Sequence, residues 1–236
     1  MFESVNEIVK KRDDSFVREI LVLNLAGKPE KSVEYLTNSN FHFREGSSRV
    51  RDITVDAHLL LGKKYFAEKK YDQALEQFLL TIESPDKTGI GRRSGDSRSA
   101  QIYYFVGQAY EMLGNKAKAK MYYMFSIEPS IIESDYVTYY QGLSYLKLGN
   151  KIKASESFNK LVEEGNKRLE KGSETDFFAK FGEKEAANVQ LSNAYLLIGL
   201  GEKGLGNANP STEKLKKAVE LSASNLWATI ELQNKF

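Results

Sequence analysis

The chain has 236 residues, with 34 Lys and Arg against 32 Asp and Glu, so its formal net charge is only +2. Hydrophobic residues make up 41% and charged residues 28%, which is typical of a folded globular protein and excludes disordered and fibrous classes. The small net charge argues against a nucleic-acid partner, because such proteins carry a basic excess. There is no cysteine and there are only two histidines, so the sequence has no signature of a disulfide, a thiol nucleophile or a metal site, and we expect no cofactor.

Neither a targeting segment nor a membrane span is visible in the sequence. Residues 1–14 alternate apolar and charged side chains, whereas a signal peptide has a continuous apolar core. The longest apolar stretch, at about residues 194–200, is much shorter than the ~18 residues of a membrane span. We therefore expect a soluble chain without a membrane partner, cytoplasmic rather than exported.

The first predicted element is a degenerate helical hairpin over residues 14–38. Phe16–Ala26 reads as one helix and Glu30–Leu36 as a second, with Gly27-Lys28-Pro29 between them. Proline fits the first position of a helix, where its missing N–H group has no intrahelical partner.

Three stretches then repeat one pattern, which predicts helix pairs over residues 52–83, 98–127 and 133–171. In each stretch a glycine is followed by tyrosine after three residues, alanine after twelve and an aromatic residue after sixteen. The three sets are Gly62, Tyr65, Ala74 and Phe78; Gly107, Tyr110, Ala119 and Tyr123; Gly142, Tyr145, Ala154 and Phe158. The last two glycines are 35 residues apart, close to the ~34 residues of a tetratricopeptide repeat. We expect the glycine to lie at a helix crossing with the alanine opposite, and the aromatic residue to fill the gap between hairpins.

On these residues the chain resembles the tetratricopeptide repeat family over Thr54–Leu161. The resemblance implies an all-α fold, a right-handed α-solenoid of antiparallel helix pairs with about five hairpins. We expect ten or eleven helices and no strand, because no period-2 run occurs. The solenoid is expected to be one domain over residues 1–236.

The C-terminal part is predicted as a second degenerate hairpin over residues 183–222 and a capping helix over residues 225–236. We expect a helix at Glu185–Gly199, a glycine-rich loop at Gly201–Asn209 and a helix from Pro210 to about Leu221. Trp227, the only tryptophan, is expected to pack on the preceding hairpin rather than to act in function.

Three connections, Thr37–Arg51, Ser84–Ser97 and Gly172–Glu183, are longer than plain repeats need. Long insertions in repeat proteins form loops that often carry function. The first two follow second helices, so we expect them to meet at one edge, with Glu45 paired to a neighbouring arginine. Arginines gathered there suit recognition of phosphate or carboxylate. The candidate loop residues are His42, Arg44, Glu45, Arg92 and Arg93.

A structural interpretation of the same loops stays open. Phe41 and Phe43 then anchor the first loop while His42 bonds to the backbone, and Gly89–Gly95 is simply a solvated loop.

An ordered series of residues carries a second, more specific resemblance. It runs through Phe41-His42, Glu45-Gly46, Ala57-His58, Leu61-Gly62, Ala74-Leu75, Phe78, Ser84-Pro85 and Gly89-x-Gly91-Arg92. The series is similar to the helical part of a bacterial family of uncharacterised multidomain proteins, over about residues 16–160. In that family a β-rich region resembling carbohydrate-active folds precedes the repeats, so the resemblance implies a carbohydrate-related context.

The first helices of the repeats supply the remaining candidate site, because their residues line the inner, concave face of such a solenoid. A mixture of tyrosine, glutamine and lysine suits a groove for an extended peptide. The alternative is chance, since the chain has 13 tyrosines and 13 phenylalanines. The candidate groove residues are Lys63, Phe66, Tyr104, Gln108, Tyr136 and Tyr139.

These observations favour a non-catalytic scaffold that binds a protein or peptide in its groove. Two alternatives remain: an accessory helical region of a larger carbohydrate-related enzyme, and binding of a small anion or sugar at the arginine-bearing loops. The sequence does not determine the oligomeric state.

Overall fold

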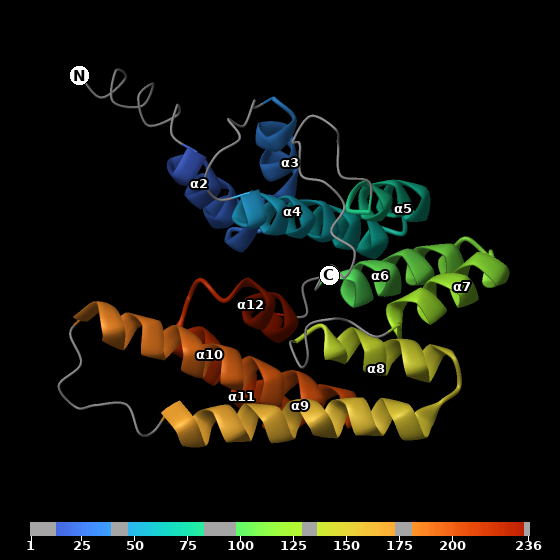
Figure 1. The fold of residues 1–236 in the computed structure, drawn as a ribbon. Helices are drawn as coiled ribbons and strands as arrows, with labels where there is room; N and C mark the ends of the chain where they lie inside the picture. Colours follow the sequence, from blue (N-terminus) through green and yellow to red (C-terminus); the bar gives the residue numbers. More distant parts are fainter. Residues whose placement is uncertain (1–12, 39–46, 83–97, 129–135, 173–180, 234–236) are drawn as a thin grey trace, which may run out of the picture. The chain divides into compact units, whose positions relative to one another are not determined.

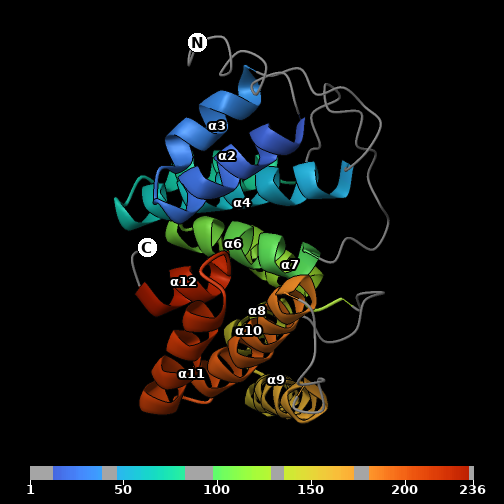
Figure 2. The same ribbon diagram turned by 90° about the vertical axis from the view of Figure 1, so that its left-hand side faces the viewer.

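The computed structural model describes residues 13–38, 47–82, 98–128, 136–172 and 181–233. Within these ranges the chain forms eleven helices and no strand, which confirms the all-α prediction (Figures 1 and 2). The helices are α2 (Asp13–Leu25), α3 (Pro29–Thr37), α4 (Ser47–Ala67), α5 (Tyr71–Leu80), α6 (Ser99–Met112), α7 (Lys116–Ser126), α8 (Thr138–Lys147), α9 (Lys151–Gly172), α10 (Phe181–Gly204), α11 (Ala208–Leu221) and α12 (Leu226–Gln233).

The helices belong to two compact units. Unit 1 contains the hairpins α2–α3 and α4–α5 together with Met112–Gly114. Unit 2 contains the rest of α6–α7, then α8–α9, α10–α11 and α12. The prediction of a single domain over residues 1–236 stays a prediction.

All five hairpins turn in the same way. Two residues after the end of each first helix, one residue has a positive φ, between 61° and 87°. The N–H group of the next residue donates to the carbonyl five residues earlier. This pattern is the Schellman motif, which satisfies the last carbonyls of a helix. The positive-φ residues are Gly27, Lys69, Gly114, Gly149 and Gly206. The repeat register therefore covers five hairpins, although the sequence pattern is clear in only three.

Lys69 is the one non-glycine residue at this turn position, and its φ of 61° gives a direct test. A side chain in the left-handed region costs about 1–2 kcal/mol, and glycine loses part of that gain through the entropy of the unfolded chain. We expect Lys69→Gly to raise the free energy of unfolding by about 0.5–1 kcal/mol, measured by urea denaturation. Lys69→Ala is the control, because it removes the ammonium but keeps the Cβ, and it should give no such gain.

The repeat glycines bring paired helices into close contact. A Cβ atom added at Gly62, Gly107 or Gly142 would lie less than 3.0 Å from a ring carbon of the aromatic residue sixteen positions later. The atoms nearest to each added Cβ belong to the ring of Phe78, Tyr123 or Phe158, in that order. The three alanines are buried as expected. The aromatic ring needs the space that a missing side chain leaves, so ring and glycine form one packing unit within the hairpin.

The first and last hairpins keep this register with other residues. In α2 the glycine position holds Ile20, which is fully buried, and Leu36 packs against its cluster from the aromatic position. In α10 the position holds Gly199, and an added Cβ there would meet Leu215, again sixteen residues later. A larger residue on one helix is thus balanced by a smaller one on its partner, which preserves the packed volume.

The predicted glycine-rich loop at residues 201–209 is wrong. Residues 201–204 are the last turn of α10, and only residues 205–207 connect it to α11. A Cβ added at Gly201 would lie 2.6 Å from the Phe158 carbonyl oxygen and 2.6 Å from Val162. The close packing of α10 on α9 therefore requires glycine here. Helix α9 itself has 22 residues and is overlong, as predicted.

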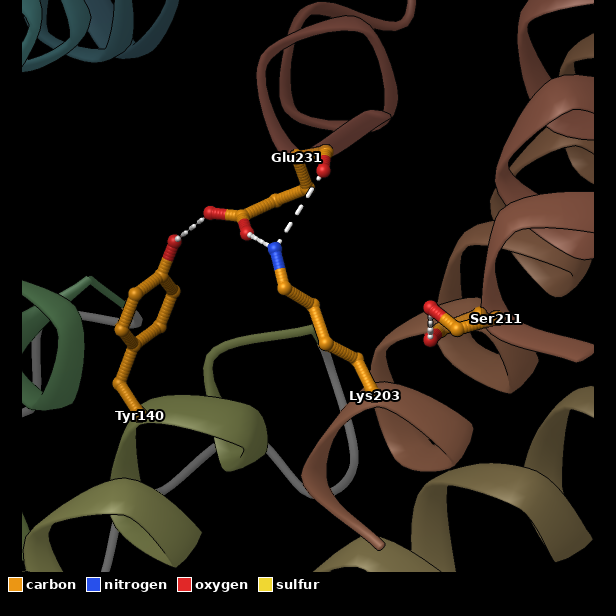
Figure 3. A network of polar contacts seen from close by, with 5 residues as sticks. Tyr140, Lys203, Ser211 and Glu231 are labelled. Carbon is orange, nitrogen blue, oxygen red and sulfur yellow. Dashed lines mark hydrogen bonds and ion pairs between the residues drawn. The ribbon is translucent and has the colours of Figure 1, made fainter. Parts of the chain in front are cut away.

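The start of α11 also differs from the prediction, since the helix begins at Ala208 rather than at Pro210. Ser211 does not cap the helix. It is buried, and its hydroxyl donates to the carbonyl of Gly199 at 2.8 Å, which ties the two helices of the hairpin together (Figure 3).

Candidate functional site

The predicted groove residues differ in how accessible they are. In unit 1, Lys63 and Phe66 are half-buried on α4, and the Phe66 ring packs edge-on against Tyr71 at 5.2 Å. In unit 2, Gln108 and Tyr136 are half-buried. Tyr104 and Tyr139, by contrast, are only 7% and 6% exposed.

Tyr104 and Tyr139 belong to the aromatic core of unit 2. Both rings pack on Tyr140, with centroids 5.8 Å and 5.4 Å away. Burial raises the pKa of both phenols, and the nearby carboxylate of Glu231 raises it further. The two tyrosines thus offer little surface to a ligand and mainly pack within the core of unit 2.

Helix α12 packs on this aromatic core at Tyr140. Trp227, only 5% exposed, stacks on Tyr136 with centroids 6.2 Å apart and meets Tyr140 edge-on at 6.3 Å. The guanidinium of Arg98, which precedes α6, lies 5.7 Å from the ring centroids of both Tyr136 and Trp227, within cation–π range. We predicted that Trp227 packs on the preceding hairpin, α10–α11. Its indole also contacts Tyr136, just before α8, and Tyr140, within α8.

The polar end of α12 is held by an ion pair. Lys203 of α10 donates to the Glu231 carboxylate at 2.7 Å and to the Glu231 carbonyl at 3.3 Å. Figure 3 shows the carboxylate between this ammonium and the Tyr140 hydroxyl, which donates to it at 3.5 Å. The Glu231 side chain is only 9% exposed, so its charge needs these partners.

The start of α12 is fixed by Asn225. Its side-chain oxygen accepts the N–H of Ala228 at 3.2 Å, an N-cap, while its amide donates to the Ser192 hydroxyl on α10 at 2.9 Å. One residue therefore both begins the helix and ties it to the hairpin.

We name the residues that receive α12 the α12 seat. They are Arg98, Gln101, Tyr136, Tyr140 and Lys203. Gln101 contributes by accepting a 2.9 Å bond from Nε of Arg98. Sequence reasoning missed Lys203 and Glu231. The signal that could have found Lys203 is Gly199, which is a repeat glycine of α10. Lys203 follows Gly199 by four residues, as Phe66 follows Gly62, and this position was predicted to lie on the inner face.

The C-terminal ends of α6 and α8 carry more accessible residues, of which Glu111 and Leu146 stand four positions after a repeat glycine, as Phe66 does in α4. Leu146 is 43% exposed, and Glu111 and Lys147 form a 2.7 Å ion pair with side chains 41% and 36% exposed. Burial alone raises the pKa of Glu111, but hydrogen bonds from Lys147 and Tyr123 outweigh it and hold the pKa below its usual value. We name this set the open strip: Gln108, Glu111, Leu143, Leu146 and Lys147.

The predicted loop site lies outside the described residues, since His42, Arg44, Glu45, Arg92 and Arg93 fall in 39–46 and 83–97. Anion or sugar binding there, and the meeting of the two loops, stay predictions. Arg98, at the edge of the second range, is described, and it is buried against Tyr136 and Trp227.

His58 on α4 gives a pH prediction for unit 1. Burial lowers its pKa below the usual value, while a 2.9 Å bond in which Nδ1–H donates to Gln77 opposes this. Because the folded pKa is the lower one, the unfolded chain binds the proton more readily, and stability is lost as the pH falls below about 6.5. We expect His58→Gln to flatten the pH dependence of unfolding between pH 7 and 5, measured by urea denaturation across that range.

The comparisons with known proteins agree with the repeat register. Residues 100–128 match the family model of the tetratricopeptide repeat. The match spans the hairpin α6–α7, in which Gly107 and Tyr123 form the packing unit described above. No curated protein matches the chain.

One solved structure aligns along nearly the whole length. It is the crystal structure of YrrB, described as a TPR protein with an unusual peptide-binding site, at 13% identity, covering 98% of this chain and 97% of that chain with a TM-score of 0.34. The helical-repeat fold is shown by the repeat register and by the family match over residues 100–128. Neither match supports the carbohydrate-related context.

Two further findings concern the described residues alone. Among them, no group of three or more His, Cys, Asp or Glu side chains is placed to hold a metal ion. None of their helices combines the length and the apolar composition that crossing a membrane requires.

Proposed function

We propose that this chain is a non-catalytic scaffold that binds a protein or peptide on the inner face of its helix pairs. The observation that carries the proposal is the open strip, where exposed leucine lies beside a charged pair on successive first helices. Apolar surface flanked by paired charges suits an extended or helical peptide, because burial of the apolar part supplies affinity and the charges fix register. The tetratricopeptide match over residues 100–128 supports the same class of function by analogy of fold.

The proposal predicts that a charge in place of the exposed leucine of the open strip weakens binding. Random peptides displayed on phage are selected on the full chain, and the enriched peptides are then measured against variants by fluorescence polarisation. We expect Leu146→Asp to weaken binding at least about tenfold, since it buries an unpaired carboxylate in the interface.

The matched control is Met124→Asp on α7, which places the same charge at a residue that is 52% exposed. This variant should bind as the unchanged chain does. If the enriched peptides lose affinity for Met124→Asp and keep it for Leu146→Asp, the binding surface is the exposed face of α7 and the proposal is overturned.

A further inference from the structure

The α12 seat has the composition of a ligand site, although a segment of the same chain fills it. It offers an aromatic wall at Tyr136 and Tyr140, a cation over that wall at Arg98, and a second cation at Lys203. A wall with two cations is complementary to a helix that carries an aromatic side chain and a carboxylate on one face.

The residues on one face of α12 are complementary to the seat in this way. Trp227, Ile230 and Glu231 stand at positions i, i+3 and i+4, so they share one face of the helix. Trp227 and Ile230 are each 5% exposed, and the Glu231 side chain is 9% exposed, so all three are engaged.

Helix α12 is too short to exist without the seat. It has eight residues, whereas isolated helices need about 12–15 residues to be even marginally stable in water. Its order therefore comes from docking, as for a short motif that folds on its partner. Because only residues 222–225 connect α12 to α11, the effective concentration of α12 at the seat is on the order of millimolar.

We propose that the α12 seat is a recognition site for an amphipathic helix bearing an aromatic, an aliphatic and an acidic residue at i, i+3 and i+4. Helix α12 occupies this site in cis and competes with a partner helix of the same chemistry. The proposal deepens the scaffold function and rests on it, but it concerns the seat and not the open strip. A partner gains access in proportion to the fraction of molecules in which α12 is undocked.

The single tryptophan makes the competition visible, because fluorescence excited at the long-wavelength edge of the tryptophan band, where tyrosine does not absorb, reports Trp227 alone. The probe is a peptide with the sequence of residues 222–233 in which the tryptophan is replaced by phenylalanine. Titrated into the unchanged chain, it should displace α12 and shift the Trp227 emission to longer wavelength. The same peptide with the acidic residue replaced by glutamine should shift it at least about tenfold less effectively.

Variants of the full chain separate the seat from its occupant. Asn225→Ala removes the cap of α12 and leaves the seat intact, so a labelled probe should bind this variant at least about tenfold more tightly than the unchanged chain. Adding Lys203→Met should remove most of that gain. Trp227→Ala is a second way to free the seat and should behave as Asn225→Ala does, with circular dichroism verifying that each variant is folded.

The proposal is overturned if the probe fails to bind folded Asn225→Ala and Trp227→Ala, or if it binds equally well with and without Lys203. Either result leaves the phage-selected peptides and their dependence on Leu146 untouched, so failure of this proposal is distinct from failure of the scaffold function. Conversely, probe binding without any effect of Leu146→Asp on selected peptides supports the seat and contradicts the open strip.

Discussion

Replacing Gly142 by leucine is expected to destabilise unit 2 by about 3 kcal/mol, at the upper end of overpacking costs. A Cβ atom at this position would already lie less than 3.0 Å from the ring of Phe158. The ring is confined from a second helix as well, because a Cβ added at Gly204 of α10 would also lie 2.3 Å from it. Phe158 is 2% exposed, so the added leucine atoms must displace one of three helices.

Thermal and urea denaturation measure this loss, with Ser155→Leu as the control. Ser155 is exposed on α9, and leucine there should change stability by less than about 0.5 kcal/mol. Gly107→Leu should cost less than Gly142→Leu, about 1–3 kcal/mol, because a glycine presses on Tyr123 from one side only. Equal melting temperatures for Gly142→Leu and the unchanged chain would show that the assigned register is wrong.

Removing the Trp227 side chain is expected to release α12 as a local unfolding unit. Truncating a buried tryptophan costs about 3–5 kcal/mol, and here the stacking on Tyr136 and Tyr140 is lost with the buried area. Because α12 is terminal in unit 2, the loss cannot exceed the free energy of its own docking, so the rest of the unit stays folded.

Hydrogen exchange tests this expectation directly. In Trp227→Ala the amides of α12 should exchange nearly as fast as in an unstructured peptide, while those of α8 and α9 keep their protection. Trp227→Phe is the control: it retains a ring on Tyr136 and should retain most of the protection. Slow exchange of α12 in Trp227→Ala would mean that the helix is held chiefly by Leu226, Ala228 and Ile230, which are also buried.

Local rules account for much of the fold. A glycine with an aromatic residue sixteen positions later predicts a close helix pair, and a glycine followed by asparagine predicts the turn after it. Ile20, Lys69 and Leu215 broke these patterns in sequence but not in structure. The larger Ile20 stands in place of glycine and the smaller Leu36 in place of the aromatic residue, so the total packed volume is kept. At Lys69 the turn keeps its shape although a non-glycine residue has a positive φ. Residue identity at one position cannot reveal such compensation, because it depends on the residue across the interface.

Composition misled where tertiary packing decided. Gly201 and Gly204 read as loop residues because glycine is a poor helix former, yet α9 passes so close that only glycine fits. Likewise, the periodicity of the first helices placed Tyr104 and Tyr139 on the inner face, but their exposure depends on what covers that face.

By itself, the sequence determined the helical class, the antiparallel pairs and the positions of most turns, since each depends on contacts between residues fewer than about twenty positions apart. The tertiary structure alone decided what occupies the inner face of unit 2. Trp227 meets Tyr136 across 91 positions, and Glu231 meets Lys203 from a different helix pair. No short-range pattern encodes such contacts, because they exist only once three hairpins have stacked and brought their first helices together beneath α12.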